Sequence, residues 1–310
     1  MAKNAAILRA LVVLLLGLPA AIGCAGTAAP AGDQRGTIAA WAENTPQGLA
    51  EMGVTQVRTG CGAPPETCVQ RVAALERSEG IGKVAITLAL PRPDPGQVLD
   101  YAARYAQLSA RTPGLVEIGI DDYYHFMRRN TPPDFTAVVE TARSAGPPLL
   151  FGVTLYEDEL DSVAQSPALF PPELLARIDR VYLYLHYRAN GPDYARYVTR
   201  ARALFPNAQI FGGVYAYDRI DYIACAEGPD KTPCTRDQEI GLFREALTGQ
   251  IALMRSGTID GLEFYPGQFG REERWNGWNE ERICRPDRRA ECIENTQEMR
   301  RIARSLLAGR

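Results

Sequence analysis

The stretch LVEIGIDDYY, residues 115–124, decides the fold expected for this chain. Its side chains alternate between two faces of an extended segment, one aliphatic and the other small or acidic: Val116, Ile118 and Ile120 against Glu117, Gly119 and Asp121. Alternation with a period of two residues is typical of a β-strand. An apolar face opposite a face of small and acidic residues fits a strand of a closed parallel barrel, which has helices outside and a tightly filled interior.

The two aspartates at the end of this strand indicate a functional end of the barrel. Asp121 and Asp122 stand where the strand is expected to end, and the carboxyl ends of the strands carry the active site in (β/α)8 barrels. Burying a carboxylate without a partner costs several kcal/mol, so Glu117 and Asp121 need partners, water or a ligand. We predict that Asp121 belongs to the active centre of such a barrel.

The rest of the chain repeats a strand-like segment followed by a helix-like one. The expected strands are residues 37–43, 54–59, 83–90, 115–124, 149–156, 180–187, 209–217 and 261–265. Strands that alternate with helices in this way indicate parallel pairing. Eight units predict a single (β/α)8 TIM barrel over residues 37–310 rather than an open doubly wound sheet. No G-x-G-x-x-G or Walker pattern is present in the sequence, which weakens a nucleotide-binding alternative.

The charge of the chain argues against one class of partner. The 310 residues have a formal net charge of −3, and lysine occurs only at positions 3, 83 and 231. The arginines are spread along the chain and form no basic run of the kind that tracks a phosphate backbone. Nucleic acid is therefore not an expected partner, and the sequence does not indicate an oligomeric state.

The N-terminus has the pattern of an export signal. Basic residues precede a short apolar run and then small residues, which predicts a signal peptide over residues 1–23. The sequence AIGC at residues 21–24 resembles a bacterial lipobox, although leucine is more usual where Ala21 stands. The resemblance implies cleavage before Cys24, lipidation of Cys24 and anchoring to a membrane of the cell envelope, on the periplasmic side or at the cell surface. Ordinary cleavage further on would instead give a secreted protein. Residues 24–36 are rich in alanine, glycine and proline and are expected to form a flexible tether.

The remaining cysteines also indicate export. Six cysteines allow 15 pairings, but sequence proximity favours three local disulfides: Cys61 with Cys68, Cys225 with Cys234, and Cys284 with Cys292. Disulfides persist in oxidising compartments. Free thiols or a metal site are the alternatives, yet the chain has no C-x-x-C motif and only two histidines, so we expect no zinc. All three pairs are expected in strand-to-helix loops, where they would stiffen the rim of the barrel.

Alternation along the other strands predicts which side chains enter the barrel. In the sixth strand three aliphatic residues face the helices, which turns Tyr182, Tyr184 and His186 inward. In the eighth strand the same argument turns Glu263 and Tyr265 inward. The predicted rim is acidic, aromatic and poor in cations. Its members are Arg58, Asp121, Tyr156, Tyr184, His186, Tyr215, Glu263 and Tyr265.

Several chemistries lack the residues they need. Schiff-base chemistry needs an inward lysine at the carboxyl end of a strand, whereas Lys83 begins its strand. His125 and His186 are too few for a metal-dependent amidohydrolase, and no G-x-S-x-G nucleophile motif is present. We therefore predict no metal and no other cofactor. A phosphodiesterase that uses the two histidines as acid and base stays open, although His125 is expected in a loop beyond the fourth strand.

Paired carboxylates are the chemistry that the predicted rim supports. Hydrolysis of a glycosidic bond needs a protonated acid at the leaving oxygen and an ionised carboxylate as nucleophile or base. We predict Asp121 as the acid and Glu263 as the second carboxylate, with the two roles open to exchange. Asp122, Glu157 and Asp158 are alternative candidates for either of these two catalytic carboxylates.

The predicted barrel resembles the large class of (β/α)8 glycoside hydrolases. Residues 114–124, GLVEIGIDDYY, resemble the fourth-strand signature of chitinase-like barrels, in which acidic residues alternate and end in the catalytic acid. Glu117 and Asp121 match that alternation, but Gly119 replaces an acid and Asp121 stands in place of a glutamate. This departure puts a substrate-assisted mechanism in doubt. The two aspartates followed by aromatic residues also resemble uncharacterised bacterial barrel proteins related to glycosidases.

The resemblance implies an exported protein that cleaves glycosidic bonds of a polysaccharide or cell-envelope glycan. Trp275 and Trp278, in the loop after the eighth strand, are expected to stack on sugar rings, since exposed aromatic residues otherwise favour association. An alternative is that these tryptophans pack within their own loop. The alternative function is a lipoprotein that binds glycans on a barrel scaffold without cleaving them.

Overall fold

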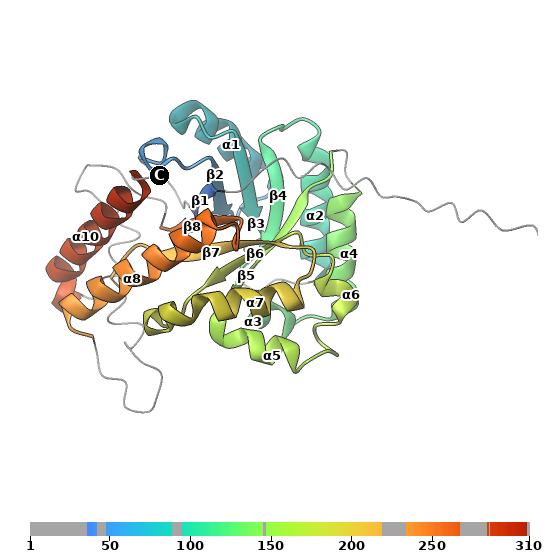
Figure 1. Cartoon of the computed structure of the whole chain (residues 1–310). Coiled ribbons are helices and arrows are strands. Elements are labelled where there is room, and N and C mark those ends of the chain that lie inside the picture. Colours follow the sequence, from blue (N-terminus) through green and yellow to red (C-terminus); the bar gives the residue numbers. More distant parts are fainter. Residues whose placement is uncertain are drawn as a thin grey trace, which may run out of the picture. The chain divides into compact units, whose positions relative to one another are not determined.

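The computed structural model describes residues 36–41, 48–88, 95–144, 147–218, 234–266, 284 and 286–308. Within them, eight parallel strands pair in chain order and close into a barrel, because β1 pairs with both β2 and β8 (Figure 1). The strands are β1 Thr37–Trp41, β2 Gln56–Gly60, β3 Lys83–Thr87, β4 Leu115–Ile120, β5 Leu150–Tyr156, β6 Arg180–Tyr184, β7 Gln209–Tyr215 and β8 Gly261–Tyr265. The predicted (β/α)8 barrel is confirmed.

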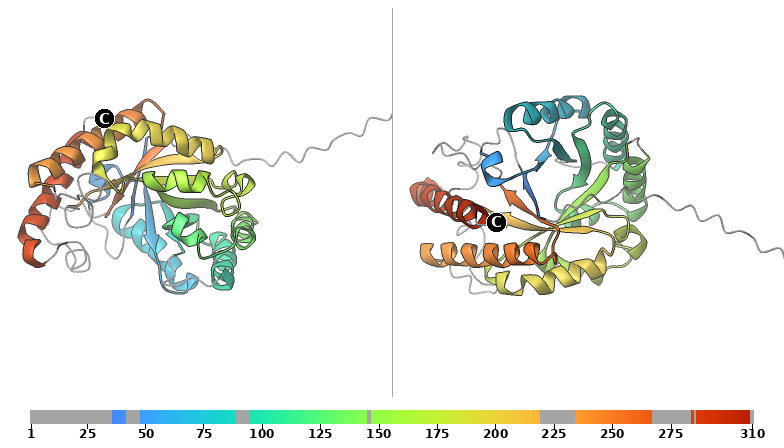
Figure 2. Two further views of the ribbon diagram at one scale, coloured as in Figure 1. Left: turned by 90° about the horizontal axis from the view of Figure 1, so that it is seen from below. Right: turned by 45° about the horizontal axis from the view of Figure 1, so that its top comes forward.

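Helices surround the barrel on its outside (Figure 2). The longer ones are α1 Pro65–Glu79, α2 Pro95–Ser109, α4 Pro132–Arg143, α7 Tyr194–Leu204, α8 Arg236–Arg255 and α10 Arg289–Ala308. The short ones are η1 Ala50–Met52, α3 Tyr123–Met127, η2 Glu157–Glu159, α5 Leu160–Ala164, α6 Pro172–Leu175, η3 Arg188–Asp193 and η4 Pro286–Arg288. Among the helices formed by the described residues, none is both long and apolar enough to cross a membrane.

Local sequence signals fix the ends of several helices. α1 begins at Pro65, whose missing N–H would have no partner in the first turn, and it stops at Gly80, which has a φ of 68°. α8 begins with a capping box in which Thr235 Oγ1 accepts the Gln238 N–H and the Gln238 side chain accepts the Thr235 N–H. These signals place the helices so that their apolar faces cover the strands.

The main hydrophobic core lies between the strands and the helices. The outward side chains of the strands are fully buried there, among them Val57, Val84, Ile86, Ile118, Phe151, Val153, Val181, Leu183, Ile210, Leu262 and Phe264. Burying side chains of this size stabilises the fold by about 1.5–3 kcal/mol each. The aliphatic face of residues 115–120 therefore packs outward, as the alternation predicts.

Inside the barrel, small residues make room for very large ones. Arg58, Arg180, Tyr182 and Tyr184 are fully buried in the interior. A Cβ at Gly213 would lie 2.2 Å from the Tyr184 ring, and a Cβ at Gly152 would lie 2.1 Å from a Glu117 carboxylate oxygen. The glycines on β5 and β7 are thus required by the bulk of the side chains opposite them.

Several predicted boundaries and assignments differ from the structure. The third strand ends at Thr87 instead of residue 90. His125 lies in the helix α3 rather than in a loop, because the chain turns into a helix directly after Asp122. The signal peptide, Cys24 and the tether up to residue 35 lie outside the described residues and stay predictions.

Two of the predicted disulfides are confirmed, Cys61–Cys68 and Cys284–Cys292. Cys68 and Cys292 lie in α1 and α10 rather than in loops, so each bond ties a loop to the start of the next helix. Cys234 is also disulfide-bonded, and its predicted partner Cys225 lies outside the described residues.

Candidate active site

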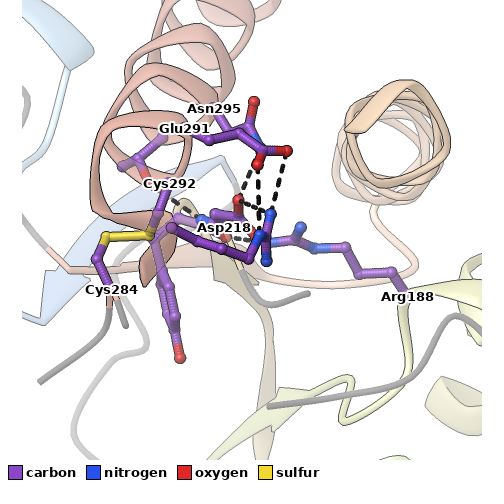
Figure 3. The surroundings of a disulfide bond; sticks show 9 residues. Arg188, Asp218, Cys284, Glu291, Cys292 and Asn295 are labelled. Carbon is purple, nitrogen blue, oxygen red and sulfur yellow. Dashed lines mark hydrogen bonds and ion pairs between the residues drawn. A yellow bond between two sulfur atoms is a disulfide. The ribbon is translucent and has the colours of Figure 1, made fainter. Parts of the chain in front are cut away.

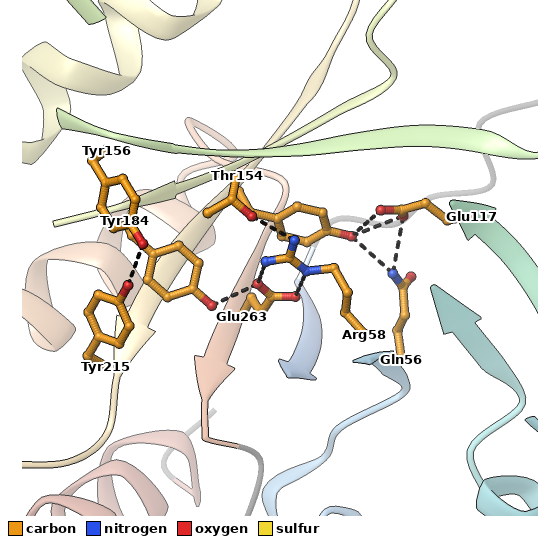
Figure 4. A network of polar contacts seen from close by, with 9 residues as sticks. Gln56, Arg58, Glu117, Thr154, Tyr156, Tyr184, Tyr215 and Glu263 are labelled. Atoms are coloured by element: carbon orange, nitrogen blue, oxygen red, sulfur yellow. Dashed lines mark hydrogen bonds and ion pairs between the residues drawn. The ribbon is translucent and has the colours of Figure 1, made fainter. Parts of the chain in front are cut away.

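A buried ion pair between β2 and β8 forms the floor of the site (Figure 4). Arg58 Nε donates to Glu263 Oε1 at 2.8 Å, and Arg58 Nη2 donates to Glu263 Oε2 at 2.6 Å. The third side of the guanidinium donates to Thr154 Oγ1 on β5 at 2.7 Å. Tyr184 OH, on β6, donates to Glu263 Oε2 at 2.7 Å. Four strands therefore meet at one ion pair.

The surroundings of Arg58 keep this ion pair charged. The guanidinium lies 4.2 Å from the centre of the Trp41 ring and 4.1 Å from that of Tyr182. Burial opposes its charge, but the adjacent Glu263 carboxylate more than offsets burial and raises the pKa of Arg58. Glu263 has no exposed surface, so a molecule at the mouth of the barrel does not reach its oxygens in this structure.

A second buried ion pair lies deeper in the barrel. Arg180 Nη1 on β6 donates to Glu117 Oε2 on β4 at 2.6 Å, and Tyr182 OH donates to the same carboxylate. Gln56 Oε1 accepts a hydrogen bond from Arg180 at 2.8 Å. Burial raises the pKa of Glu117, although Arg180 and Arg58 oppose that shift. Glu117, which the sequence left without an assigned partner, is thus part of the interior of the fold.

Asp121 lies directly above these pairs, where β4 ends. It is partly exposed, and burial together with the adjacent Asp122 raises its pKa to about 6. Arg58 and a hydrogen bond with Thr154 act in the opposite direction. Asp122 is exposed and has a φ of 47°, which turns the chain from β4 into α3. Asp121 is therefore a carboxyl group that takes up and releases a proton near neutral pH.

Three acidic residues follow β5 and line the same end of the barrel. Glu157 accepts hydrogen bonds from the backbone N–H groups of His186 at 2.7 Å and Tyr187 at 3.0 Å. It also accepts one from Asn190 Nδ2 at 3.2 Å. Burial raises the pKa of Glu157, although the N–H donors act against that shift. Glu157 thereby holds the turn that follows β6.

Glu159 has an unusual environment for a carboxyl group. Its Oε2 accepts the Tyr156 N–H at 3.1 Å, whereas its buried Oε1 accepts no hydrogen bond and lies 3.5 Å from His125 Nε2. Burial raises the pKa of Glu159 to about 8, with smaller contributions from Asp158 and Asp122. Asp122 thus acts on both Asp121 and Glu159, which places the acids after β4 and β5 within electrostatic reach of each other.

Aromatic side chains make up much of the rest of this end of the barrel. The Tyr156 ring stacks on His186 at 3.6 Å, and Tyr156 OH hydrogen-bonds Tyr215 OH at 2.8 Å. His186 Nδ1 lies 2.8 Å from Asp158 Oδ1. The Tyr215 ring contacts the Tyr265 ring edge to face at 5.8 Å. Rings from β5 to β8 therefore form a continuous aromatic wall.

The carboxyl end of β7 is fixed from outside (Figure 3). Arg188 Nη2 donates to the carbonyl oxygens of Tyr215 at 2.6 Å and Tyr217 at 2.7 Å, and Arg188 Nη1 pairs with Glu239 on α8. Tyr217 packs against the Cys284–Cys292 disulfide. Asn295 on α10 donates to Asp218 Oδ2 at 2.7 Å. The segment after β7 is thus tied to α8 and α10.

One group of side chains has the spacing of a metal site. Ligand atoms of Glu157, Asp158 and His186 lie within 4.8 Å of one another. Both Glu157 oxygens already accept N–H donors, and Asp158 and His186 hydrogen-bond each other. These hydrogen bonds account for the close spacing without an ion.

The structure brings most of the predicted rim to one end of the barrel. Six of its members end their strands or follow them closely: Asp121, Tyr156, Tyr184, His186, Tyr215 and Tyr265. Arg58 and Glu263 stand at the middle of β2 and β8, one layer deeper. Asp122 lies exposed beside them. Trp275 and Trp278 lie outside the described residues. Trp41 and Glu159 are not among the predicted site residues, although Trp41 ends its strand and Glu159 belongs to the acidic run after β5.

The chain shares its fold with solved enzymes of known activity. A GH113 β-1,4-mannanase matches with 12% identity and a TM-score of 0.52, over 89% of this chain and 99% of that one. An exo-β-1,4-mannosidase from Opitutaceae bacterium strain TAV5 matches with 11% identity and a TM-score of 0.52, over 87% of this chain and 59% of that one. No family profile and no curated protein matches the sequence. By its fold, therefore, the chain is similar to the (β/α)8 barrels of glycoside hydrolases.

Proposed function

We propose that this protein is an exported glycoside hydrolase that cleaves glycosidic bonds of a polysaccharide or cell-envelope glycan, with Asp121 as its general acid. One observation carries the proposal. Asp121 stands partly exposed at the carboxyl end of β4 with a pKa raised to about 6, which lets it hold a proton for the leaving oxygen. The shared fold with a mannanase supports the same class of reaction.

The second carboxylate in this proposal is Asp122 rather than Glu263. A nucleophile or base must reach the sugar or a water beside it, and Asp122 is exposed whereas Glu263 is fully buried. Glu263 instead holds Arg58 in place below Asp121. Asp158, exposed and paired with His186, is the substitute at this position.

Hydrolysis of a panel of glycans tests the assignment. Release of reducing ends from β-1,4-mannan, chitin and peptidoglycan would be measured with the wild type and with Asp121→Asn and Asp122→Asn. Each substitution should lower kcat by about a hundredfold or more, since it removes an acid–base or nucleophilic group. Glu173→Gln, an exposed change on α6 before β6, is the control and should leave kcat unchanged. Activity that survives Asp121→Asn at the wild-type rate would refute the assignment.

Glu263→Gln separates a structural role from a catalytic one. Because it breaks a buried ion pair, we expect it to lower the free energy of unfolding by about 3–5 kcal/mol. We expect no such loss from the exposed Asp122→Asn. A Glu263→Gln variant that keeps its stability and loses turnover would contradict the structural role and show that Glu263 is catalytic.

Binding without cleavage is the second candidate function. Both interior glutamates, Glu117 and Glu263, are held in buried ion pairs, which is what a scaffold without a second accessible acid would show. Such a protein would bind oligosaccharides through Tyr156, Tyr215 and Tyr265 with no release of reducing ends. A phosphodiesterase that uses the group of Glu157, Asp158 and His186 would instead gain activity on added divalent metal.

Anchoring to the cell envelope by lipid at Cys24 belongs to the same proposal. Its support is the lipobox-like sequence AIGC at residues 21–24. Labelling of cells with a fatty-acid analogue should mark the wild type and leave Cys24→Ser unmarked. Labelled Cys24→Ser protein would contradict the anchor.

A further inference from the structure

Among the residues that the structure describes, the acids at the mouth of the barrel outnumber the available positive charges. We define the acidic mouth as Asp121, Asp122, Glu157, Asp158 and Glu159. Arg58 and Arg188, the arginines that reach this end of the barrel from β2 and η3, are held by Glu263 and by Glu239 with two backbone carbonyls. In the described part of the chain, neither of them is available to balance a ligand's negative charge.

A second observation concerns an oxygen that accepts no hydrogen bond. Glu159 is only 5% exposed, and its Oε1 accepts no hydrogen bond. Leaving a buried acceptor in that state costs about 1–3 kcal/mol. His125, whose Nε2 lies 3.5 Å away, has a half-exposed side chain, so the oxygen lies directly beneath the surface of the acidic mouth. A positively charged donor would meet this oxygen and would displace the proton that Glu159 otherwise holds up to about pH 8.

The aromatic wall indicates which kind of ligand the acidic mouth could bind. The rings of Tyr156, Tyr215 and Tyr265 stand beside the acids, and the pKa of Tyr156 responds to both Asp121 and Asp122. Aromatic faces attract cations as well as the apolar faces of sugar rings. Carboxylates and rings together favour a ligand that has a sugar face and a positive charge.

We propose that the acidic mouth binds a sugar that carries a protonated amine. The amine lies among Asp122, Asp158 and Glu159, and the sugar ring lies against the aromatic wall. This inference rests on the proposed function and names its substrate class. A neutral or N-acylated sugar of the same shape would leave the carboxylates without a charged donor and bind more weakly.

Calorimetric titration with matched oligosaccharides tests the inference. Oligomers of glucosamine, of N-acetylglucosamine and of mannose with the same length would be titrated at a mildly acidic pH, where the free amines are protonated. The glucosamine oligomer should bind at least about tenfold more tightly than the other two, since one charge-assisted hydrogen bond contributes about 1.5–3 kcal/mol. Its affinity should also fall with added salt, as expected for contacts between charges.

Substitutions locate the binding. Asp158→Asn should weaken binding of the glucosamine oligomer several-fold while leaving binding of the mannose oligomer unchanged. Glu173→Gln removes one exposed negative charge at the amino end of β6, opposite the acidic mouth. It should change the affinity for neither oligomer. Equal affinities for the three oligomers, or unchanged binding of the glucosamine oligomer in Asp158→Asn, would overturn the inference. Stoichiometric Mn²⁺ binding in dialysis with no amine binding would also overturn it and point to Glu157, Asp158 and His186 as a metal site.

The two proposals fail in different ways. If neutral glycans are cleaved with dependence on Asp121 and the glucosamine oligomer does not bind preferentially, the function stands and the substrate class is wrong. If the glucosamine oligomer binds as expected and no glycan is cleaved, the binding inference stands and the hydrolase is wrong.

Discussion

Asp121 and Asp122 are adjacent and chemically identical, yet their surroundings give them different properties. Asp121 is partly buried over the Arg58–Glu263 pair, whereas Asp122 is turned outward by its positive φ. Burial and the neighbouring charge raise the pKa of Asp121 to about 6. A carboxyl group whose environment raises its pKa toward neutrality is what general acid catalysis requires.

The pH dependence of activity should report on Asp121. A general acid works in its protonated form, so kcat/KM should fall as the pH rises through about 6. Thr154→Val removes a hydrogen bond that lowers the pKa of Asp121, and the falling limb should therefore move to higher pH. The measurement is a pH profile of both proteins on the glycan that the wild type cleaves.

Glu173→Gln should not change the pH at which kcat/KM falls, because its carboxylate is exposed at the amino end of β6. A limb that does not move in Thr154→Val would show that another group controls the profile.

At the same scale, alternation along each strand predicts which side chains point into the barrel but not which partners they contact there. Arg58 and Glu263 are 205 residues apart in the sequence. Their contact depends on the stagger of β2, β1 and β8 around a closed sheet, and a pattern along one strand carries no information about that stagger. Glu263 was therefore predicted as a free carboxylate and is found paired.

Among the elements, β7 depends most visibly on one small residue. A methyl group at Gly213 would overlap the ring of Tyr184, which is buried and hydrogen-bonded to Glu263. We expect Gly213→Ala to destabilise the protein by about 1–3 kcal/mol or more, as overpacking does. Urea unfolding with the disulfides intact would measure it.

Gly249→Ala on α8 is the matched control, because no atom lies within 4 Å of its new methyl group. Replacing an exposed helical glycine by alanine should stabilise the protein by about 0.5–1 kcal/mol. Loss of stability in this variant, or none in Gly213→Ala, would contradict the packing described for the interior.

The elements that the sequence predicted are those with a long periodic pattern. Most of the strands carry alternation, whereas α3 and α5 have only five residues each and too few turns to show a helical period. The placement of His125 in a loop failed for that reason. The helix α10 starts at Arg289, and its first turns are polar and resemble a loop in sequence.

For the molecule as a whole, raised carboxyl pKa values make stability depend on pH. Glu159 holds its proton up to about pH 8 in the folded protein, against an ordinary value of 4.5. Between these values the folded state binds the extra proton, so the free energy of unfolding falls as the pH rises. Asp121 contributes in the same direction between 3.8 and about 6.

Glu159→Gln should therefore raise the free energy of unfolding at neutral pH by up to about 3 kcal/mol, and it should have little effect at pH values below the ordinary range of a glutamate. Urea unfolding of both proteins over this pH range would measure the difference. A gain that is the same at every pH would mean that a change in packing, and not the lost charge, stabilises the variant.

The two interior ion pairs also favour one register of the strands when the sheet closes into a barrel. Arg58 on β2 meets Glu263 on β8 across β1, and Arg180 on β6 meets Glu117 on β4 across β5. A slip of β2, β4, β6 or β8 by a single residue would turn a charged side chain out of the barrel and leave its counterion alone in a dry interior. A barrel with misaligned strands is therefore destabilised at two levels along its axis. The residues that fill the interior thus also select one strand register among those that eight parallel strands could adopt.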